Sequence, residues 1–349
     1  MDSVDLYRRL DQGAGAGPVS DPARIDAVVE DIRGALTNAL QAPSTVRGWR
    51  AQALFGSIVA ALDGCELMML IDSGEIFFDG ESVKAPDYFL RLRDGRRVLV
   101  DVKADDRVPD SIDLAVKYSA SEIRRLRRFG DLYDAPVFIA VYFEAPVLWV
   151  LVPLHRLTEG PGGGYRLTFK ETLLYNEMAI LGDYMVGTVP PLTWVLKFDP
   201  VEPQTRSADG TLSAQVDEVV QFAGGVKLQA PEAEQIASFL MQYGGWENRV
   251  ENVFEGDRLL EQHRIVEPPE VSEQGFEMVG QLSAMYSRMF EQSTQSTEGP
   301  TALDLDVAPG SLVTLIPHDY DLDELPLWRM RVHPDYATGT SEVQDDRTA

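Results

Sequence analysis

The stretch over residues 85–104, APDYFLRLRDGRRVLVDVKA, constrains the fold more than any other part of the chain. Apolar and charged residues alternate on both sides of Asp94-Gly95, as in a β-hairpin that buries one face. A two-residue turn at Asp94-Gly95 would mix apolar and charged side chains on both faces. A three-residue loop over residues 94–96, with Gly95 or Arg96 in a left-handed conformation, separates them, so the pattern favours that loop.

This loop also predicts which residues lie opposite one another. One face becomes wholly apolar, with the pairs Leu92–Val98, Leu90–Val100 and Tyr88–Val102. The other face brings Asp87, Asp101 and Lys103 together at the open end of the hairpin, with Asp87 opposite Lys103. Charged groups are costly to bury without partners. We therefore expect these three side chains to form a site, and the alternative is a turn residue followed by a solvated strand edge.

The elements around the hairpin follow from the spacing of apolar residues. A repeat of three and four predicts helices over residues 21–40, 45–62 and 111–132, the last beginning at Ser119, Ser121 or Asp113. Apolar runs predict strands over residues 65–72, 136–143 and 147–153, of which 136–143 is apolar almost throughout and should be central. The order is helix, three strands, helix and two strands, which indicates an α/β fold with a mixed central sheet flanked by helices.

Beyond residue 155 the pattern is weaker. We predict a β-rich extension over residues 156–230, with strands within 165–178 and 190–198, and a mainly helical C-terminal α+β domain over residues 231–335. That domain should hold helices within 231–246 and 272–290 and strands near 312–316 and 328–332, in a winged-helix-like arrangement that contacts a protein partner or a second copy. Residues 291–302 should be a mobile linker and residues 336–349 a disordered tail. Residues 1–44 would be an N-terminal helical segment.

Charge is distributed unevenly along the chain. The 31 Lys and Arg residues against 56 Asp and Glu give a net charge of −25, which does not suit a simple nucleic-acid binder. Residues 84–128 are the exception, with 12 basic against 8 acidic residues, which leaves 19 against 48 elsewhere. The basic residues therefore gather where the hairpin and the following helix lie.

Two further features concern the cellular compartment. The single cysteine, Cys65, excludes an internal disulfide and fits a reducing environment. The sequence shows no apolar run long enough to span a membrane and no apolar segment behind a basic start. We expect a cytoplasmic protein that does not contact membranes.

The residues Pro86-Asp87, the hairpin, and Asp101-Val102-Lys103 at the end of an aliphatic strand resemble the PD-(D/E)XK, or restriction-endonuclease-like, superfamily of nucleases. The resemblance covers residues 45–155 and implies a restriction-endonuclease-like core with αβββαβ order. It further implies that Asp87, Asp101 and the backbone carbonyl of Val102 bind Mg²⁺ or Mn²⁺, and that Lys103 orients the attacking water or neutralises developing charge. Hard divalent cations bind such oxygen donors and activate water.

This sequence departs from the family at one position. Many members carry a further acidic residue on the helix before the first strand, and residues 45–62 contain none. Gln52 and Glu66 are weak candidates for that place. If neither reaches the ion, the site has two carboxylates or is completed by a partner. Lys117 is a weak candidate for a phosphate contact at the start of the following helix.

The resemblance implies a Mg²⁺-dependent endonuclease, with DNA favoured over RNA as its substrate. The predicted nucleic-acid contacts are Arg91, Arg93, Arg124, Arg125 and Arg128, and for the helix the alternative is an ordinary solvated face. Because the rest of the chain is acidic, we expect a protein partner or a homo-oligomer within a multi-subunit bacterial antiviral defence or DNA-processing system. The alternative function is a catalytically inactive scaffold subunit with the nuclease fold.

Overall fold

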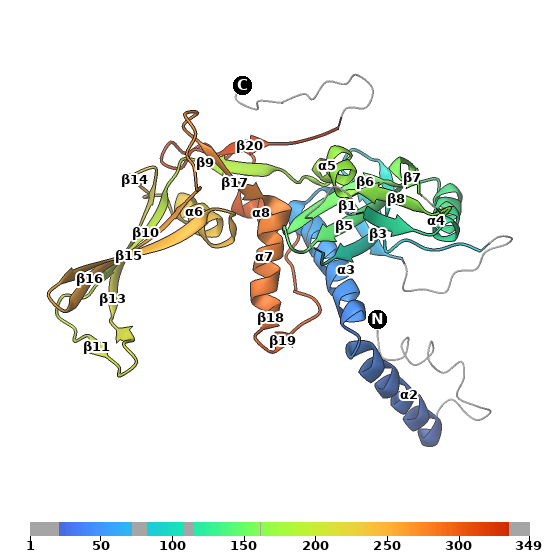
Figure 1. Ribbon diagram of the computed structural model, residues 1–349, viewed down its shortest axis with the longest axis horizontal. Coiled ribbons are helices and arrows are strands. Elements are labelled where there is room, and N and C mark those ends of the chain that lie inside the picture. Colours follow the sequence, from blue (N-terminus) through green and yellow to red (C-terminus); the bar gives the residue numbers. More distant parts are fainter. Residues whose placement is uncertain (1–20, 72–81, 108–114, 161, 335–349) are drawn as a thin grey trace. The chain divides into compact units, whose positions relative to one another are not determined.

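The structure is a computed structural model that describes residues 21–71, 82–107, 115–160 and 162–334 (Figure 1). The chain divides into two compact units, residues 1–51 and 52–349. Helix α2 (Pro22–Leu40) belongs to the first unit, and helix α3 (Pro43–Leu62) begins in the first and ends in the second. Both helices confirm the sequence prediction. The predicted tail over residues 336–349 and the candidate cap Asp113 lie outside the described residues.

A five-stranded sheet forms the centre of the second unit. Its order is β1 (Cys65–Leu70), β2 (Tyr88–Leu92), β3 (Arg97–Asp105), β5 (Val137–Phe143) and β6 (Leu148–Pro153). Strands β3 and β5 are parallel, whereas the other neighbours are antiparallel. Every residue of β5 is buried, as its apolar run predicts. The predicted mixed α/β sheet is therefore confirmed.

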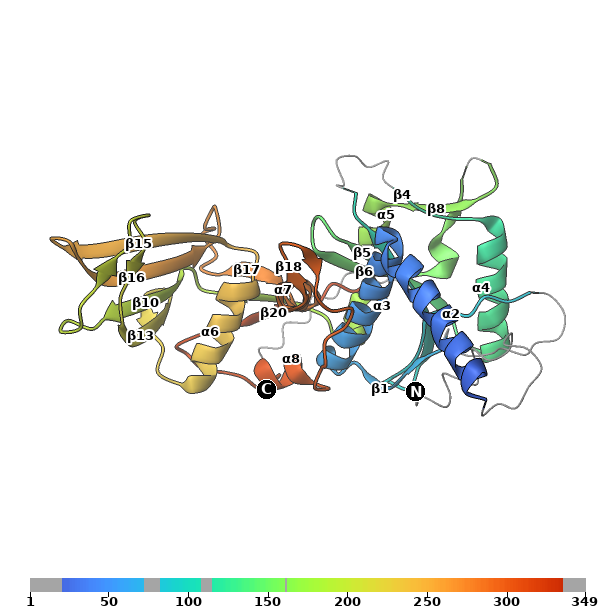
Figure 2. The ribbon, with the colours of Figure 1, turned by 90° about the horizontal axis from the view of Figure 1, so that it is seen from below.

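Helices cover both faces of this sheet. Helix α4 (Ala120–Tyr133) makes the crossover between the parallel strands, and its Ile123, Leu126 and Phe129 share one buried cluster with Phe89 and Leu99 (Figure 2). On the opposite face Phe55 of α3 packs its ring 5.7 Å from that of Tyr88 and 5.6 Å from that of Trp149. Odd-numbered residues of the hairpin thus face α4 and even-numbered residues face α3.

The hairpin has a three-residue loop, but at residues 93–95 rather than 94–96. Gly95 adopts φ +84°, and the pairs are Tyr88–Val100, Leu90–Val98 and Arg91–Arg97. Each residue of β2 therefore lies opposite a residue two positions earlier than predicted. The two predicted faces are still correct, because a register shift of two residues keeps every side chain on the same face of the sheet.

Two other sequence predictions were wrong, and a third, for residues 165–178, was right only in part. Residues 115–118, predicted as helix, form strand β4 (Ala115–Tyr118), and α4 begins only at Ala120, where Ser119 caps it through a capping box with Glu122. The segment 165–178, predicted to contain strand, has strand β8 (Tyr165–Thr168) followed by helix α5 (Phe169–Leu174). Residues 312–316, predicted as strand, lie mostly in helix α8 (Ser311–Leu315).

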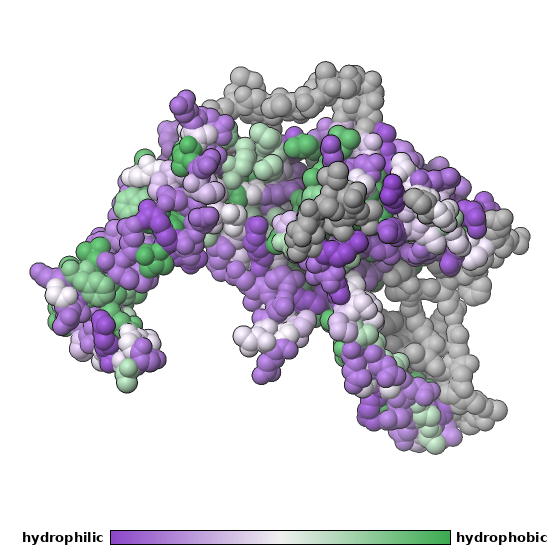
Figure 3. Space-filling model, in the orientation of Figure 1, coloured by the Kyte–Doolittle hydropathy of each residue, from purple (hydrophilic) through white to green (hydrophobic). Residues whose placement is uncertain are grey.

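The C-terminal part contains a second five-stranded sheet that the sequence indicated only in part. Its order is β14 (Val226–Lys227), β13 (Val216–Ala223), β10 (Leu192–Phe198), β16 (Arg258–Glu267) and β15 (Glu247–Glu255). Helix α6 (Pro231–Tyr243) covers one face, where Gln221 donates to Ser238 over 3.1 Å (Figure 2). The edge strand β15 is exposed along all nine residues, and Figure 3 shows hydrophobic residues over the outer part of this sheet.

Helix α7 (Leu282–Thr294) follows strand β17 (Glu277–Gln281), so the predicted helix over 272–290 begins later than expected. The indole Nε1 of Trp149 on β6 donates to Ser287 of α7 over 3.0 Å, which attaches α7 to the central sheet. The segment 291–302, predicted to be a mobile linker, contains the end of α7 and the short strands β18 (Gln295–Ser296) and β19 (Gly299–Pro300).

The remaining elements are short. They are η2 (Leu154–Arg156), β7 (Thr158–Glu159), η3 (Met178–Leu181), β9 (Met185–Thr188), β11 (Thr205–Arg206), β12 (Leu212–Ser213) and β20 (Trp328–Met330). Strand β20 pairs with β9 and lies within the predicted strand at 328–332. None of the described helices combines the length and apolar character needed to cross a bilayer. The finer domain limits at residues 155 and 230 stay a prediction.

Gly64 gives a direct test of the packing after α3. A Cβ on Gly64 would overlap the backbone carbonyl of Leu181. We expect Gly64→Ala to lower the free energy of unfolding by about 3 kcal/mol, since backbone must move to make room. Gly48→Ala is the matched control in α3, because no atom lies within 4 Å of its added Cβ. Urea denaturation measures both variants, and equal stability would contradict this packing.

Asp183 gives a pH test of how α7 is held. Its buried carboxylate accepts from the backbone N–H of Ser283 over 3.1 Å, from the Ser283 hydroxyl over 2.6 Å and from Gln281 over 2.7 Å. Burial nevertheless raises the pKa of Asp183 to about 6. A raised pKa in the folded state means that stability present at low pH is lost as pH rises through about 6.

We therefore expect the wild-type free energy of unfolding to fall, relative to that of Asp183→Asn, by about 1 kcal/mol between pH 5 and pH 7.5. Chemical denaturation of both proteins across this range measures the difference. A difference that is constant with pH would show that Asp183 does not titrate in this range.

Candidate metal centre

Asp101 is the most buried charged group at the open end of the hairpin. It lies on β3, faces α4 and is 2% exposed. Its Oδ1 lies 2.9 Å from Nζ of Lys84, and its Oδ2 lies 3.1 Å from Nζ of Lys103. The hydroxyl of Tyr118 also donates to Oδ2 over 3.1 Å. Two ammonium groups and a hydroxyl thus stabilise the buried carboxylate.

The Asp101 carboxylate shifts the pKa values of Lys103 and Tyr118. Burial alone would lower the pKa of Lys103, but the charge and hydrogen bond of Asp101, with further contributions from Asp87 and Glu122, raise the pKa above its ordinary value. Burial, followed by the charge of Asp101, raises the pKa of Tyr118 well above its usual range. At neutral pH Lys103 is therefore an ammonium and Tyr118 a hydroxyl donor.

Asp87 lies just before β2, next to the buried Pro86. Its Oδ2 accepts the backbone N–H of Val102, and its Oδ1 accepts Nε2 of Gln52 over 3.1 Å. The charge of Asp87 contributes to the raised pKa values of Lys103 and Tyr118. Asp87 thus contacts the backbone of Val102, the residue between Asp101 and Lys103. The observed register does not place Asp87 opposite Lys103, as the hairpin pattern predicted.

The backbone of Val102 completes this side of the site. In a strand, the N–H and C=O of one residue point to the same edge. Because the Val102 N–H is directed to Asp87, its carbonyl lies on the edge of β3 that β2 leaves uncovered. Two carboxylates and a backbone carbonyl are hard oxygen donors of the kind that Mg²⁺ and Mn²⁺ prefer, so these residues fit such an ion.

Gln52, one of the two weak candidates from the sequence, reaches Asp87 from α3. The backbone carbonyl of Gln52 also accepts the hydroxyl of Tyr88 over 2.9 Å, which fixes this turn of the helix beside β2. Across the described residues, no three side chains of His, Cys, Asp or Glu lie close enough together to hold an ion. The two carboxylates of Asp87 and Asp101 are therefore accompanied by an amide, that of Gln52, which donates its N–H to Asp87.

Glu66 does not reach this site, and two predicted arginines lie at the other end of the hairpin. Ile71 donates its N–H to the Asp87 carbonyl, so Glu66, five residues earlier on an extended strand, lies about 16 Å away. Glu66 instead pairs with Arg91 over 3.2 Å. Arg93 pairs with Asp63 near the hairpin loop. Arg91 and Arg93 therefore belong to exposed ion pairs remote from Asp87.

The other predicted contacts differ in their positions. Lys117 lies on β4 rather than at a helix start, and it points away from the site because its neighbour Tyr118 points in. Arg125 donates to the Val83 carbonyl over 3.1 Å and accepts the Lys84 N–H over 3.3 Å, so it holds the backbone around Lys84. Arg124 and Arg128 are exposed on α4.

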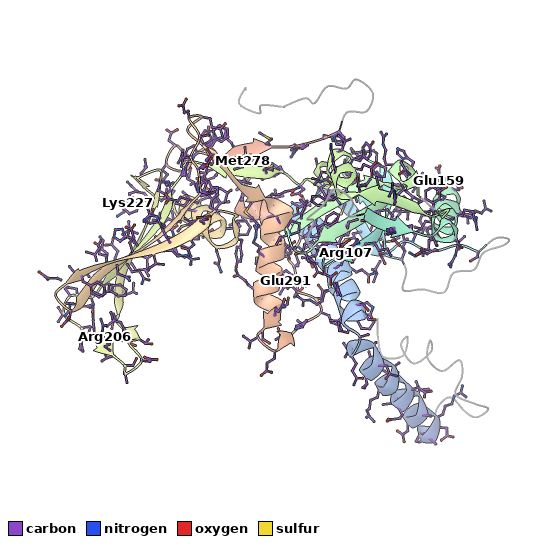
Figure 4. All side chains as sticks on the ribbon, viewed as in Figure 1. Arg107, Glu159, Arg206, Lys227, Met278 and Glu291 are labelled. Atoms are coloured by element: carbon purple, nitrogen blue, oxygen red, sulfur yellow. The ribbon has the colours of Figure 1, made fainter. Side chains whose placement is uncertain are left out.

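Sequence reasoning missed two residues of the site, Lys84 and Tyr118. Lys84 lies three residues before Asp87, within the basic region but outside the motif. Tyr118 was assigned to a helix, so its direction could not be inferred. Arg107, labelled in Figure 4, follows β3 and pairs with Asp105 rather than with Asp101.

The comparisons with known proteins found likenesses among solved structures but not among families or curated proteins. No protein-family model and no curated protein matches the sequence. A Holliday junction resolvase, Hjc, from Archaeoglobus fulgidus matches with 15% identity and a TM-score of 0.30. The match covers 39% of this chain and 96% of the resolvase. The resemblance to this nuclease is thus a weak one.

Changing Gln52 to Glu tests the geometry around Asp87. A second carboxylate in place of the amide would replace a hydrogen bond with repulsion, so we expect Gln52→Glu to lower stability by about 1–2 kcal/mol in EDTA. Mg²⁺ should reduce this loss because it binds only the folded state. Thermal unfolding with and without Mg²⁺ measures both effects. Glu66→Gln is the control, and its difference in stability from wild type should be the same with and without the ion.

Proposed function

We propose that the second unit is a metal-dependent nuclease with a restriction-endonuclease-like core, which hydrolyses phosphodiester bonds of nucleic acid, with DNA favoured over RNA. The observation that carries this proposal is the cluster of Asp87, Asp101 and Lys103 at the ends of neighbouring strands. The sheet order β1-β2-β3-β5-β6, with helices on both faces, supports the same assignment. The fold alone does not define a reaction, so the proposal depends on the motif residues and the sheet order together.

Asp87, Asp101, the Val102 carbonyl and Gln52 would hold Mg²⁺ or Mn²⁺. When bound, such an ion supplies charge neutralisation at the phosphate and a more acidic water. Lys103 keeps its positive charge beside this site and is 38% exposed, so it can contact a phosphate oxygen or orient a water. The buried hydroxyl of Tyr118 fixes the Asp101 carboxylate from the side of β4.

The path of nucleic acid is proposed to run along α4. Arg124 and Arg128 are exposed there, and Glu122 in the first turn lies 4.0 Å from Lys84 at the site. The remaining chain is acidic, which favours a partner subunit that supplies further phosphate contacts. A role in a multi-subunit bacterial defence or DNA-processing system is the corresponding biological proposal.

A non-catalytic scaffold with the same fold is the second candidate. It is favoured by the fact that Lys84, Lys103 and Tyr118 already occupy both oxygens of Asp101. An amide at residue 52 also leaves fewer acidic ligands than in many of the related nucleases.

Nicking of supercoiled plasmid in Mg²⁺ or Mn²⁺ distinguishes the two functions. We expect Asp101→Asn and Lys103→Ala to reduce the rate at least about 100-fold, since each removes a group that acts on the ion or on the phosphate. Glu66→Gln, remote from the site, should keep the wild-type rate. Cutting that persists in both site variants, or no cutting with every natural partner present, would favour the scaffold.

A further inference from the structure

Lys84 stands at the place where Asp101 would meet a divalent cation. Its Nζ lies 2.9 Å from Oδ1, the oxygen that neither Lys103 nor Tyr118 contacts. Its side chain is 26% exposed, so it can move toward solvent, whereas Asp101 cannot. The ammonium and a divalent cation would therefore compete for the same carboxylate oxygen.

The charges at the site lead to the same conclusion. A divalent cation at Oδ1 of Asp101 would lie beside the ammonium of Lys84, and two positive charges repel one another strongly in a partly buried site. Because Glu122 is a further acid beside Lys84, the ammonium can leave Asp101 without losing its counter-charge.

The structure also offers Lys84 a second acidic partner. Oε1 of Glu122, in the first turn of α4, lies 4.0 Å from Nζ of Lys84. Its carboxylate is 40% exposed, and the backbone N–H of Ser119, with lesser help from Lys84 and Lys103, lowers the pKa of Glu122. Glu122 therefore stays ionised and can accept the ammonium when Asp101 no longer holds it.

We propose that Lys84 is a displaceable counter-ion of Asp101, which weakens metal binding until nucleic acid brings a phosphate into the site. This inference rests on the proposed nuclease function. Lys84 is then a positioning residue that couples metal binding to substrate binding. It differs from Lys103, which remains on the other oxygen of the carboxylate.

The test measures Mn²⁺ binding to protein free of nucleic acid, by electron paramagnetic resonance of the unbound ion. We expect Lys84→Met to bind Mn²⁺ about tenfold more tightly than wild type, because it removes one charge-assisted contact at Asp101. Lys84→Arg keeps the charge and should bind as weakly as wild type. Arg124→Met removes a charge of the same sign from exposed α4 and controls for general electrostatics.

The outcomes separate this inference from the function on which it rests. If wild type binds Mn²⁺, Asp101→Asn does not, and Lys84→Met equals wild type, the counter-ion role is overturned while the metal centre stands. If no variant binds Mn²⁺, both proposals fail together. Melting temperatures of all variants in EDTA establish that each is folded, and Lys84→Gln replaces Lys84→Met if the latter is not.

Discussion

The structure around the candidate site depends on one interaction, the neutralisation of the Asp101 carboxylate inside the protein. A carboxylate that is 2% exposed is strongly destabilising unless it is paired and hydrogen-bonded. Three different parts of the chain meet to satisfy it: the segment before β2 through Lys84, β3 through Lys103, and β4 through Tyr118. The same contacts hold the side chains that surround the site, so the site forms when this part of the chain folds.

The hairpin shows how far sequence reasoning could go. The alternation of Tyr88, Leu90 and Leu92 with the residues between them predicted the two faces correctly, because side-chain direction has a period of two. It could not fix the register, since loops over residues 93–95 and 94–96 give the same faces. The choice depends on backbone conformation at Gly95, which residue types constrain only weakly.

The misassigned strand β4 has a different cause. Val116 and Tyr118 fit either a helix or a strand by apolar spacing, and only the pairing with β8, whose residues lie far along the chain, decides for strand. Tyr118 was missed for this reason. Lys84 was missed because an isolated basic residue before a motif has no periodic signal, whereas its partner Asp101 is defined by the strand that carries it.

The exposed edge strand β15 carries three acidic residues, Glu247, Glu251 and Glu255, spaced four apart. If two copies of the chain paired antiparallel about Glu251, that residue would face its own copy, and Glu247 would face Glu255. Like charges directly opposite one another destabilise a ladder. The strand is therefore protected against joining sheets between identical molecules, although its backbone edge is open over its full length.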